Sequence, residues 1–282
     1  MKIAKVGVVG SGIMGSGITQ VCAQAGLEVV LRSRTRERAE ATVSSIDKNL
    51  SRLVEKAKID EATKDATLSR IRTTSDLKDL SDCDLVIETV VEDLATKKDL
   101  FNHLDDICKE ECLLATNTST LPVVEMAAQT SRADKVLGIH FFNPAPVMQL
   151  VEVVKAITTS EETVEIAREF VESLGKKPVV VKDQAGFIVN ALLFPYLNNA
   201  VKLLESAVAT RDDIDQAMMA GCGFPMGPFA LLDLVGLDTS LSIIEALYEE
   251  FRDPNYAPAP LLKRLVAAGK LGRKSGEGFY EY

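Results

Sequence analysis

The sequence predicts an α/β fold, in which a mostly parallel β-sheet covered by helices is followed by a smaller all-helical domain. Short β-branched runs alternate with helical patterns up to about residue 183, which is typical of a parallel sheet with helices on both faces. Beyond that point helical patterns continue without strand alternation, between breaks such as "GFPMGP" and "DPNYAPAP". We therefore expect one domain over residues 1–183 and a second over residues 184–282.

Local patterns place the elements of the first domain. The β-branched run "KVGVVG" (5–10) predicts a buried strand, and the helical spacing of 12–26 ends at Gly26, which suits a helix C-terminus. By the same criteria further strands are predicted at 27–33, 83–90, 112–119, 135–141, 150–156 and 177–183. Helices are predicted at 36–58, 95–109, 121–129 and 161–175.

Composition excludes several classes of protein. With 46% apolar residues and a net charge of −9, the chain is typical of an ordered globular protein and not of one that binds nucleic acid through a general basic field. The five cysteines form no CxxC pair, so we expect reduced thiols and no metal site. No apolar run is long enough for a membrane helix. Glycines interrupt the N-terminal apolar run, so we expect a strand there instead of a signal peptide, and a cytoplasmic location.

The motif Gly10-Ser11-Gly12-Ile13-Met14-Gly15 has the GxGxxG form, directly after a predicted strand and before a predicted helix. Gly10 permits the tight turn, Gly12 lets the backbone approach a pyrophosphate, and Gly15 lets helix and strand pack closely. The helix N-terminus then offers N–H groups to the phosphates. This context predicts a Rossmann-type domain and makes residues 10–15 candidates for cofactor binding; a glycine turn that serves only packing is the alternative.

The second predicted strand ends in Arg32-Ser33-Arg34, where a dinucleotide site that prefers NAD carries an acidic residue for the ribose. A carboxylate there would repel a 2′-phosphate, whereas serine can donate to it and a guanidinium can bind it through two hydrogen bonds. These residues predict a preference for NADP(H), with NAD(H) as a poorer substitute. The alternative is a solvated basic loop, since Arg36 and Arg38 continue the run.

A dehydrogenase needs a group that exchanges a proton as hydride moves, and histidine suits this role near neutral pH. Of the two histidines, His103 lies in a charged helical pattern and is expected at the surface. His140 ends a predicted strand in "GIHFFNP", and Glu152 lies in the next strand-like run. Two adjacent strand ends would bring them within reach, so that the carboxylate orients the imidazole. A structural histidine in the core is the alternative.

Six segments resemble the 3-hydroxyacyl-CoA dehydrogenase family, more narrowly its stand-alone bacterial members that act on 3-hydroxybutyryl-CoA. In order along the chain they are "VGVVGSGIMGSGI", "NTST", "GIHFFNPAPVMQLVEVV", "DQAGFIVNALLFPYLNNA", "GFPMGPFALLDLVGLDT" and "GKLGRKSGEGFYEY". The resemblance covers essentially the whole chain. It implies an oxidoreductase that interconverts acetoacetyl-CoA and 3-hydroxybutyryl-CoA with a nicotinamide cofactor, and a homodimer.

The resemblance also implies roles for single residues. His140 is the implied general acid and base, Glu152 orients it, and Ser119 and Asn190 contact the acyl portion. The implied cofactor residues are Glu92, Lys97, Asn117, Ser119, Asn143 and Lys274. Asn49 and Lys56 match positions that contact coenzyme A. The smaller domain is expected to close the acyl pocket and to form the dimer.

The coenzyme A site has support from spacing as well. Lys48, Arg52 and Lys56 are four residues apart and share one face of a helix, so a basic stripe could hold phosphates although the chain as a whole is acidic. A solvated helix face is the alternative. Ser33 departs from the aspartate of family members that prefer NAD, which favours NADPH and, through cellular redox supply, the reductive direction.

Two other classes of function remain open at this point. One is a 3-hydroxyacid dehydrogenase that acts on free acids with a catalytic lysine, and "HFFNP" with a downstream glutamate argues against it. The other is a structural relative that keeps the fold and nucleotide site but has lost turnover. The presence of His140, Glu152, Ser119 and Asn190 argues against that possibility.

Overall fold

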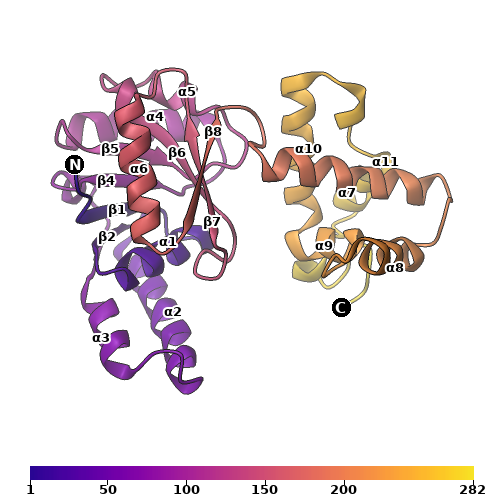
Figure 1. The fold of residues 1–282 in the computed structure, drawn as a ribbon, viewed down its shortest axis with the longest axis horizontal. Coiled ribbons are helices and arrows are strands. Elements are labelled where there is room, and N and C mark those ends of the chain that lie inside the picture. The colour runs from indigo at the N-terminus through magenta and orange to yellow at the C-terminus, as the bar shows by residue number, and fades with distance from the viewer. The chain divides into compact units, whose positions relative to one another are not determined.

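The computed structural model describes residues 1–282 and consists of two compact units, Met1–Asp183 and Gln184–Tyr282. The first unit contains a sheet of eight strands with helices packed on it, and the second unit is helical (Figure 1). The predicted fold class, an α/β domain with a mostly parallel sheet followed by a smaller helical domain, is confirmed.

The sheet has the strand order β3-β2-β1-β4-β5-β6-β7-β8. All neighbouring strands are parallel except β6 and β7, which are antiparallel. The strands are β1 (Lys5–Val9), β2 (Glu28–Arg32), β3 (Ile71–Thr74), β4 (Leu85–Glu88), β5 (Leu113–Thr116), β6 (Val136–Phe141), β7 (Leu150–Lys155) and β8 (Lys177–Lys182). Every residue of β4, β5 and β6 is buried, which explains why these strands are continuous apolar runs.

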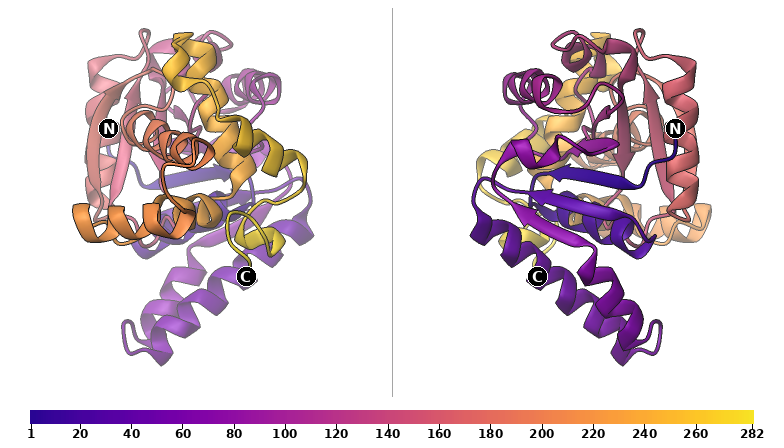
Figure 2. Two further views of the ribbon diagram at one scale, coloured as in Figure 1. Left: turned by 90° about the vertical axis from the view of Figure 1, so that its right-hand side faces the viewer. Right: turned by 90° about the vertical axis from the view of Figure 1, so that its left-hand side faces the viewer.

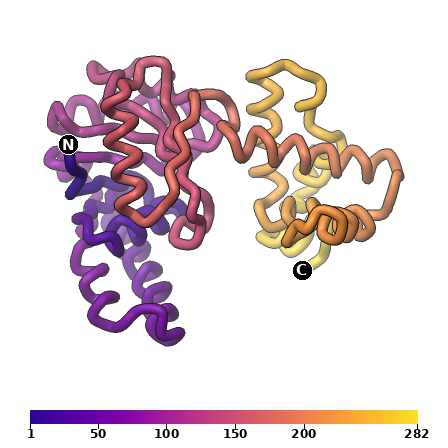
Figure 3. Tube along the Cα trace, in the orientation of Figure 1, coloured from indigo at the N-terminus to yellow at the C-terminus, as the bar shows by residue number.

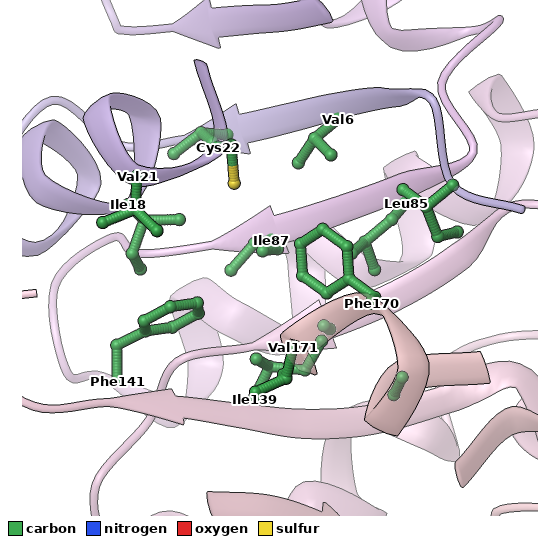
Figure 4. Close-up of a cluster of buried hydrophobic side chains, with 14 of the residues drawn as sticks. Val6, Ile18, Val21, Cys22, Leu85, Ile87, Ile139, Phe141, Phe170 and Val171 are labelled. Atoms are coloured by element: carbon green, nitrogen blue, oxygen red, sulfur yellow. The ribbon is translucent and has the colours of Figure 1, made fainter. Parts of the chain in front are cut away.

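The helices of the first unit cover the sheet. They are α1 (Ile13–Gln24), α2 (Arg36–Glu55), α3 (Glu61–Ser69), α4 (Leu94–Ile107), α5 (Val123–Ala127) and α6 (Glu161–Ser173), with 3₁₀ turns η1 (Leu77–Leu80) and η2 (Ala133–Lys135). Ile18 of α1 and Phe170 of α6 belong to one core cluster with strand residues such as Ile87 and Ile139 (Figure 4). This packing holds the N-terminus of α1 against the end of β1.

Two elements of the first unit were not predicted from the sequence. Helix α3 is polar, and β3 is a half-buried edge strand, so neither has a strong apolar pattern. Helices α2 and α3 lie side by side and project from the sheet (Figure 2). Helix α2 begins after Thr35, whose side chain accepts a hydrogen bond from the Arg38 N–H, and ends at Glu55, three residues earlier than predicted.

The second unit is built from α7 (Val189–Glu205), α8 (Arg211–Cys222), α9 (Pro228–Val235), α10 (Leu237–Phe251) and α11 (Pro260–Ala267), with 3₁₀ turns η3 (Pro254–Tyr256) and η4 (Arg273–Ser275). The chain doubles back repeatedly between these helices (Figure 3). They share their own apolar core, which includes Phe194, Phe229 and Leu247. No helix in either unit has the length and apolar character that crossing a membrane requires.

Candidate active site

Three glycines shape the turn between β1 and α1. Gly10 has a φ of +125°, and a Cβ atom built on it would lie 2.4 Å from Thr89 Oγ1. A Cβ atom on Gly15 would lie 2.0 Å from the Gly10 carbonyl oxygen, so a larger residue would force helix and strand apart. No atom lies within 4 Å of a Cβ built on Gly12, the N-cap of α1. The N-terminus of α1 is thus open to a phosphate group, and the turn fits a dinucleotide.

A cavity of about 620 Å³ lies at the carboxyl ends of β1, β2 and β4, and we call it the strand-end cavity. This edge of a parallel sheet is where ligands of doubly wound folds bind. Helix α4 contributes Asp99 and His103 to its wall. The cavity brings together the predicted cofactor residues Gly10, Ser11, Gly12, Arg32, Ser33 and Arg34.

Ser33 is anchored to the glycine turn. Its side chain is 4% exposed, and its Oγ lies 2.7 Å from Ser11 Oγ. The Arg32 Nε donates to the Ser75 carbonyl at 3.2 Å, and burial together with the charge of Arg34 lowers the pKa of the Arg32 guanidinium. Arg34 is exposed and forms no salt bridge. Asp99 is the one carboxylate that lines this cavity, so its wall beside Ser33 is basic.

A second cavity of about 980 Å³ lies along one face of α2, and we call it the helix-face cavity. The predicted residues Asn49, Arg52 and Lys56 line it from α2 and its C-terminal end, and Asn143 lines it from the turn after β6. Lys48 does not line it, so the basic stripe is narrower than the four-residue spacing predicts. Ile13, which is 76% exposed, also faces this cavity, whereas Met14 packs against the core.

His140 and Glu152 are direct cross-strand partners. They pair in the register of antiparallel strands β6 and β7, and His140 Nδ1 lies 2.8 Å from Glu152 Oε2. Glu152 is fully buried and His140 is 4% exposed. His140 is the second-last residue of β6 and Glu152 is the third residue of β7, so the pair lies near the adjoining ends of these two strands. Because a carboxylate only accepts hydrogen bonds, Nδ1 carries the proton and Nε2 is the nitrogen that can exchange one.

Ser119 lies on the other side of the imidazole, with its Oγ 3.1 Å from His140 Nε2. The Ser119 backbone N–H donates to Glu92 Oε1 at 3.1 Å, and the Thr118 hydroxyl donates to the same oxygen. Lys97 lies 3.1 Å from the other Glu92 oxygen and is itself held by Glu88 at 2.7 Å. Burial raises the pKa of Glu88 against the opposing charge of Lys97. The predicted residues Ser119, Glu92 and Lys97 therefore form one connected network.

The remaining predicted residues are placed separately. Asn117 Oδ1 accepts a hydrogen bond of 2.8 Å from the Phe141 N–H, which fixes the end of β6. Asn190 is buried in the first turn of α7 in the second unit. Lys274 also belongs to the second unit, where its ammonium lies 2.5 and 2.6 Å from the two Asp238 carboxylate oxygens.

Two arginines of the basic run after β2 differ in a way that the sequence did not reveal. Arg36 pairs with Glu40 at 2.9 Å, whereas Arg38 lines both the strand-end cavity and the helix-face cavity. A helical projection from position 35 onward would have separated them, because they lie on different sides of α2. No group of three or more His, Cys, Asp or Glu side chains is placed to hold a metal ion.

Comparison with known proteins assigns the chain to a family. Residues 5–184 match the family described as 3-hydroxyacyl-CoA dehydrogenase, NAD binding domain, and residues 186–282 match the 3-hydroxyacyl-CoA dehydrogenase C-terminal domain. A 3-hydroxybutyryl-CoA dehydrogenase of Clostridioides difficile is 48% identical, with 99% of each chain covered. The mitochondrial hydroxyacyl-coenzyme A dehydrogenase of Homo sapiens is 45% identical, with 99% of this chain and 91% of the human protein covered.

Solved structures agree with the sequence comparison. The crystal structure of (S)-3-hydroxybutyryl-CoA dehydrogenase from Ralstonia eutropha superposes with a TM-score of 0.97 at 43% identity, and covers 100% of this chain and 99% of that one. The same family is indicated by both matched domains, by the full-length relatives and by this solved structure. The chain belongs to the 3-hydroxyacyl-CoA dehydrogenase family of oxidoreductases, and its first domain is a nicotinamide-cofactor domain.

Proposed function

We propose that the chain interconverts acetoacetyl-CoA and 3-hydroxybutyryl-CoA and uses NADP(H) in preference to NAD(H). The observation that carries the reaction is the His140–Glu152 pair, with Ser119 on the second imidazole nitrogen. The carboxylate fixes the imidazole tautomer, and the second nitrogen, Nε2, is the one that exchanges a proton. The names of the relatives from C. difficile and R. eutropha support the choice of substrate.

In the proposed mechanism the chain's own residues handle the proton. A reduced nicotinamide, when bound, would supply the hydride that C3 of the thioester receives. His140 donates the Nε2 proton to the oxygen on C3, and Glu152 stabilises the imidazolium through Nδ1. Ser119 Oγ, next to Nε2, and Asn190 hold the oxygen and the acyl group, so that developing charge meets fixed donors. In the oxidative direction Nε2 accepts the hydroxyl proton.

The proposed cofactor preference rests on the wall of the strand-end cavity. Ser33 occupies the end of β2 without a carboxylate, and Arg34 is exposed without a salt-bridge partner. A 2′-phosphate there would meet a hydroxyl and guanidinium groups, whereas a ribose hydroxyl would find no acidic acceptor. NAD(H) is the competing cofactor, because the matched family domain is described as NAD binding. The reductive direction is proposed together with NADPH.

The proposed substrate site joins the helix-face cavity to the catalytic residues. Asn49, Arg52 and Lys56 would hold the phosphates of coenzyme A along α2. Glu92 and Lys97 would lie beside the nicotinamide half, because both belong to the Ser119 network. The remaining proposed cofactor contacts are Asn117, Asn143 and Lys274.

The helical unit carries exposed apolar residues that support its association with a second copy of the chain. We propose that it contributes to the acyl pocket and forms a homodimer. Leu192 and Leu203 of α7 are 72% and 46% exposed, so this helix carries apolar surface that a second copy would cover in the proposed dimer. Light scattering on the purified chain would test the dimer. A cytoplasmic location stays a prediction from the cysteine pattern.

The experiment that tests the reaction compares thioester and free-acid substrates. With NADPH present, acetoacetyl-CoA should be reduced, while oxidation of free 3-hydroxyisobutyrate with NADP⁺ should be negligible. The 3-hydroxybutyryl-CoA product should be identified by mass, which separates true reduction from thioester hydrolysis. Activity on the free acid without activity on the thioester would replace the proposal with a 3-hydroxyacid dehydrogenase.

A further inference from the structure

Arg38 lies where the two cavities of the first unit meet. It lines the strand-end cavity and the helix-face cavity, and it shares this double position with Ser11 and Gly12 of the glycine turn. The Arg38 side chain is exposed and forms no salt bridge or hydrogen bond. Its neighbour Arg36 is engaged by Glu40 and lines neither cavity. Of the arginines that follow β2, only Arg38 lines both the strand-end cavity and the helix-face cavity.

The position of Arg38 is fixed by its helix. Thr42, one turn further along α2, donates its hydroxyl to the Arg38 carbonyl at 2.9 Å and to the Ser11 carbonyl at 3.1 Å. These contacts pin the first turns of α2 against the glycine turn. Arg38, Thr42, Asn49 and Arg52 then follow one another along the face that lines the helix-face cavity. Arg38 stands at the end of that face, next to the strand-end cavity.

The charges around Arg38 favour anions on both sides. Arg34 lines only the strand-end cavity, while Arg52 and Lys56 line only the helix-face cavity. No carboxylate lines the helix-face cavity, and Asp99 is the one carboxylate in the strand-end cavity. A guanidinium presents five N–H donors on separate edges, so it can bind phosphate oxygens from two directions at once. Without it, two phosphorylated ligands in these cavities would repel each other.

We infer that Arg38 is a phosphate-binding residue shared by both ligands, and that it couples the binding of NADP(H) to the binding of coenzyme A. The inference rests on the proposed function, which assigns one phosphorylated ligand to each cavity. Arg38 thereby raises the affinity for each ligand and screens the charge of one from the other. Through Arg38, binding of the cofactor changes the affinity for the substrate, and binding of the substrate changes the affinity for the cofactor.

The test is calorimetric titration of the chain with NADP⁺ and with free coenzyme A at low ionic strength. Arg38→Gln should raise both dissociation constants, each by about five- to tenfold. Matched variants separate the two cavities: Arg34→Gln should weaken NADP⁺ alone, Arg52→Gln should weaken coenzyme A alone, and Arg36→Gln should change neither. Since Arg38 is exposed and Gln is a good helix former, an unchanged melting temperature serves as the folding control.

A second readout measures the coupling itself. Saturating NADP⁺ should raise the dissociation constant of coenzyme A more in Arg38→Gln than in the unchanged chain, because the two anions then lack an intervening cation. The inference is wrong, while the proposed function stands, if Arg38→Gln weakens the binding of only one ligand or of neither. The same holds if the effect of NADP⁺ on coenzyme A binding is unchanged. If the unchanged chain binds no coenzyme A or no NADP⁺, both are wrong.

Discussion

His140 and Glu152 face each other across the only antiparallel pair of strands in the sheet, with Nδ1 and Oε2 2.8 Å apart. Strand β6 is followed by β7 after only residues 142–149, a connection too short for the helical crossover that a parallel neighbour requires. The reversal places the carboxylate directly beside the imidazole. Both side chains belong to buried β-strands, which gives the pair a rigid support.

Removing the imidazole should abolish proton exchange and leave the cofactor site intact. We expect His140→Ala to lower kcat by about 10²- to 10⁴-fold, the usual contribution of general acid–base catalysis. NADPH affinity, measured by fluorescence titration, should stay within about twofold, because His140 does not line the strand-end cavity. A variant with near-normal turnover would remove His140 from the mechanism.

Replacing the carboxylate should produce a smaller loss. Glu152→Gln keeps the side-chain shape but removes the negative charge that stabilises the imidazolium, and its amide can face either imidazole tautomer. We expect kcat to fall by less than in His140→Ala, because the imidazole and its Nε2 remain in place. Initial rates of acetoacetyl-CoA reduction by the two variants would check this. Loss of activity through unfolding would instead appear as a lowered melting temperature.

The side chain at position 33 should control cofactor choice. Ser33→Asp places a carboxylate at the end of β2, where it would repel a 2′-phosphate and accept hydrogen bonds from a ribose. We expect kcat/KM for NADPH to fall by about tenfold or more, and kcat/KM for NADH to rise. Ser33→Ala is the matched control, since it removes the Ser11 hydrogen bond without adding charge. If kcat/KM for NADPH and for NADH is the same in Ser33→Asp as in the unchanged chain, position 33 does not contact the ribose.

The N-terminus of α4, the helix that carries Lys97, offers a pH-dependent test of stability. Hydrogen bonds from Thr96 hold the pKa of the exposed Asp93 carboxyl below its usual value. A depressed folded-state pKa gives stability that is present above the unfolded pKa of about 4 and is lost as pH falls through the folded value. Asp93→Ala should therefore lower the melting temperature by a few degrees at pH 7, and this difference should shrink at lower pH.

An equal melting-temperature loss at all pH values would contradict a role for the Asp93 charge. Asp93→Asn is the control, because asparagine retains a capping oxygen without the charge. It should lose less stability than Asp93→Ala at pH 7.

Structure could be predicted from the sequence wherever only one type of residue suits a position. Gly10 and Gly15 could be predicted because no side chain fits at those positions, and the buried strands because they are continuous apolar runs. Strand β3 could not be predicted from the sequence, because its residues Ile71–Thr74 are half exposed at the sheet edge. The apolar run of β7 does not reveal its antiparallel pairing, because it resembles the runs of the parallel strands.

Within the site, the catalytic residues could be predicted from the sequence, but the contacts between them could not. His140 and Glu152 were identified as a pair, but their cross-strand register came only from the structure. The double position of Arg38 was also hidden, because two cavities and a helix face meet there only in three dimensions. In the sequence it is one arginine in a basic run.

The first measurement should be initial rates of acetoacetyl-CoA reduction with NADPH and with NADH under identical conditions. We expect clear reduction, with a kcat/KM at least about tenfold higher for NADPH, because Ser33 and Arg34 leave the ribose site basic. A preference for NADH would contradict the assignment of the basic wall to a 2′-phosphate. Absence of reduction with either cofactor would contradict the proposed reaction itself.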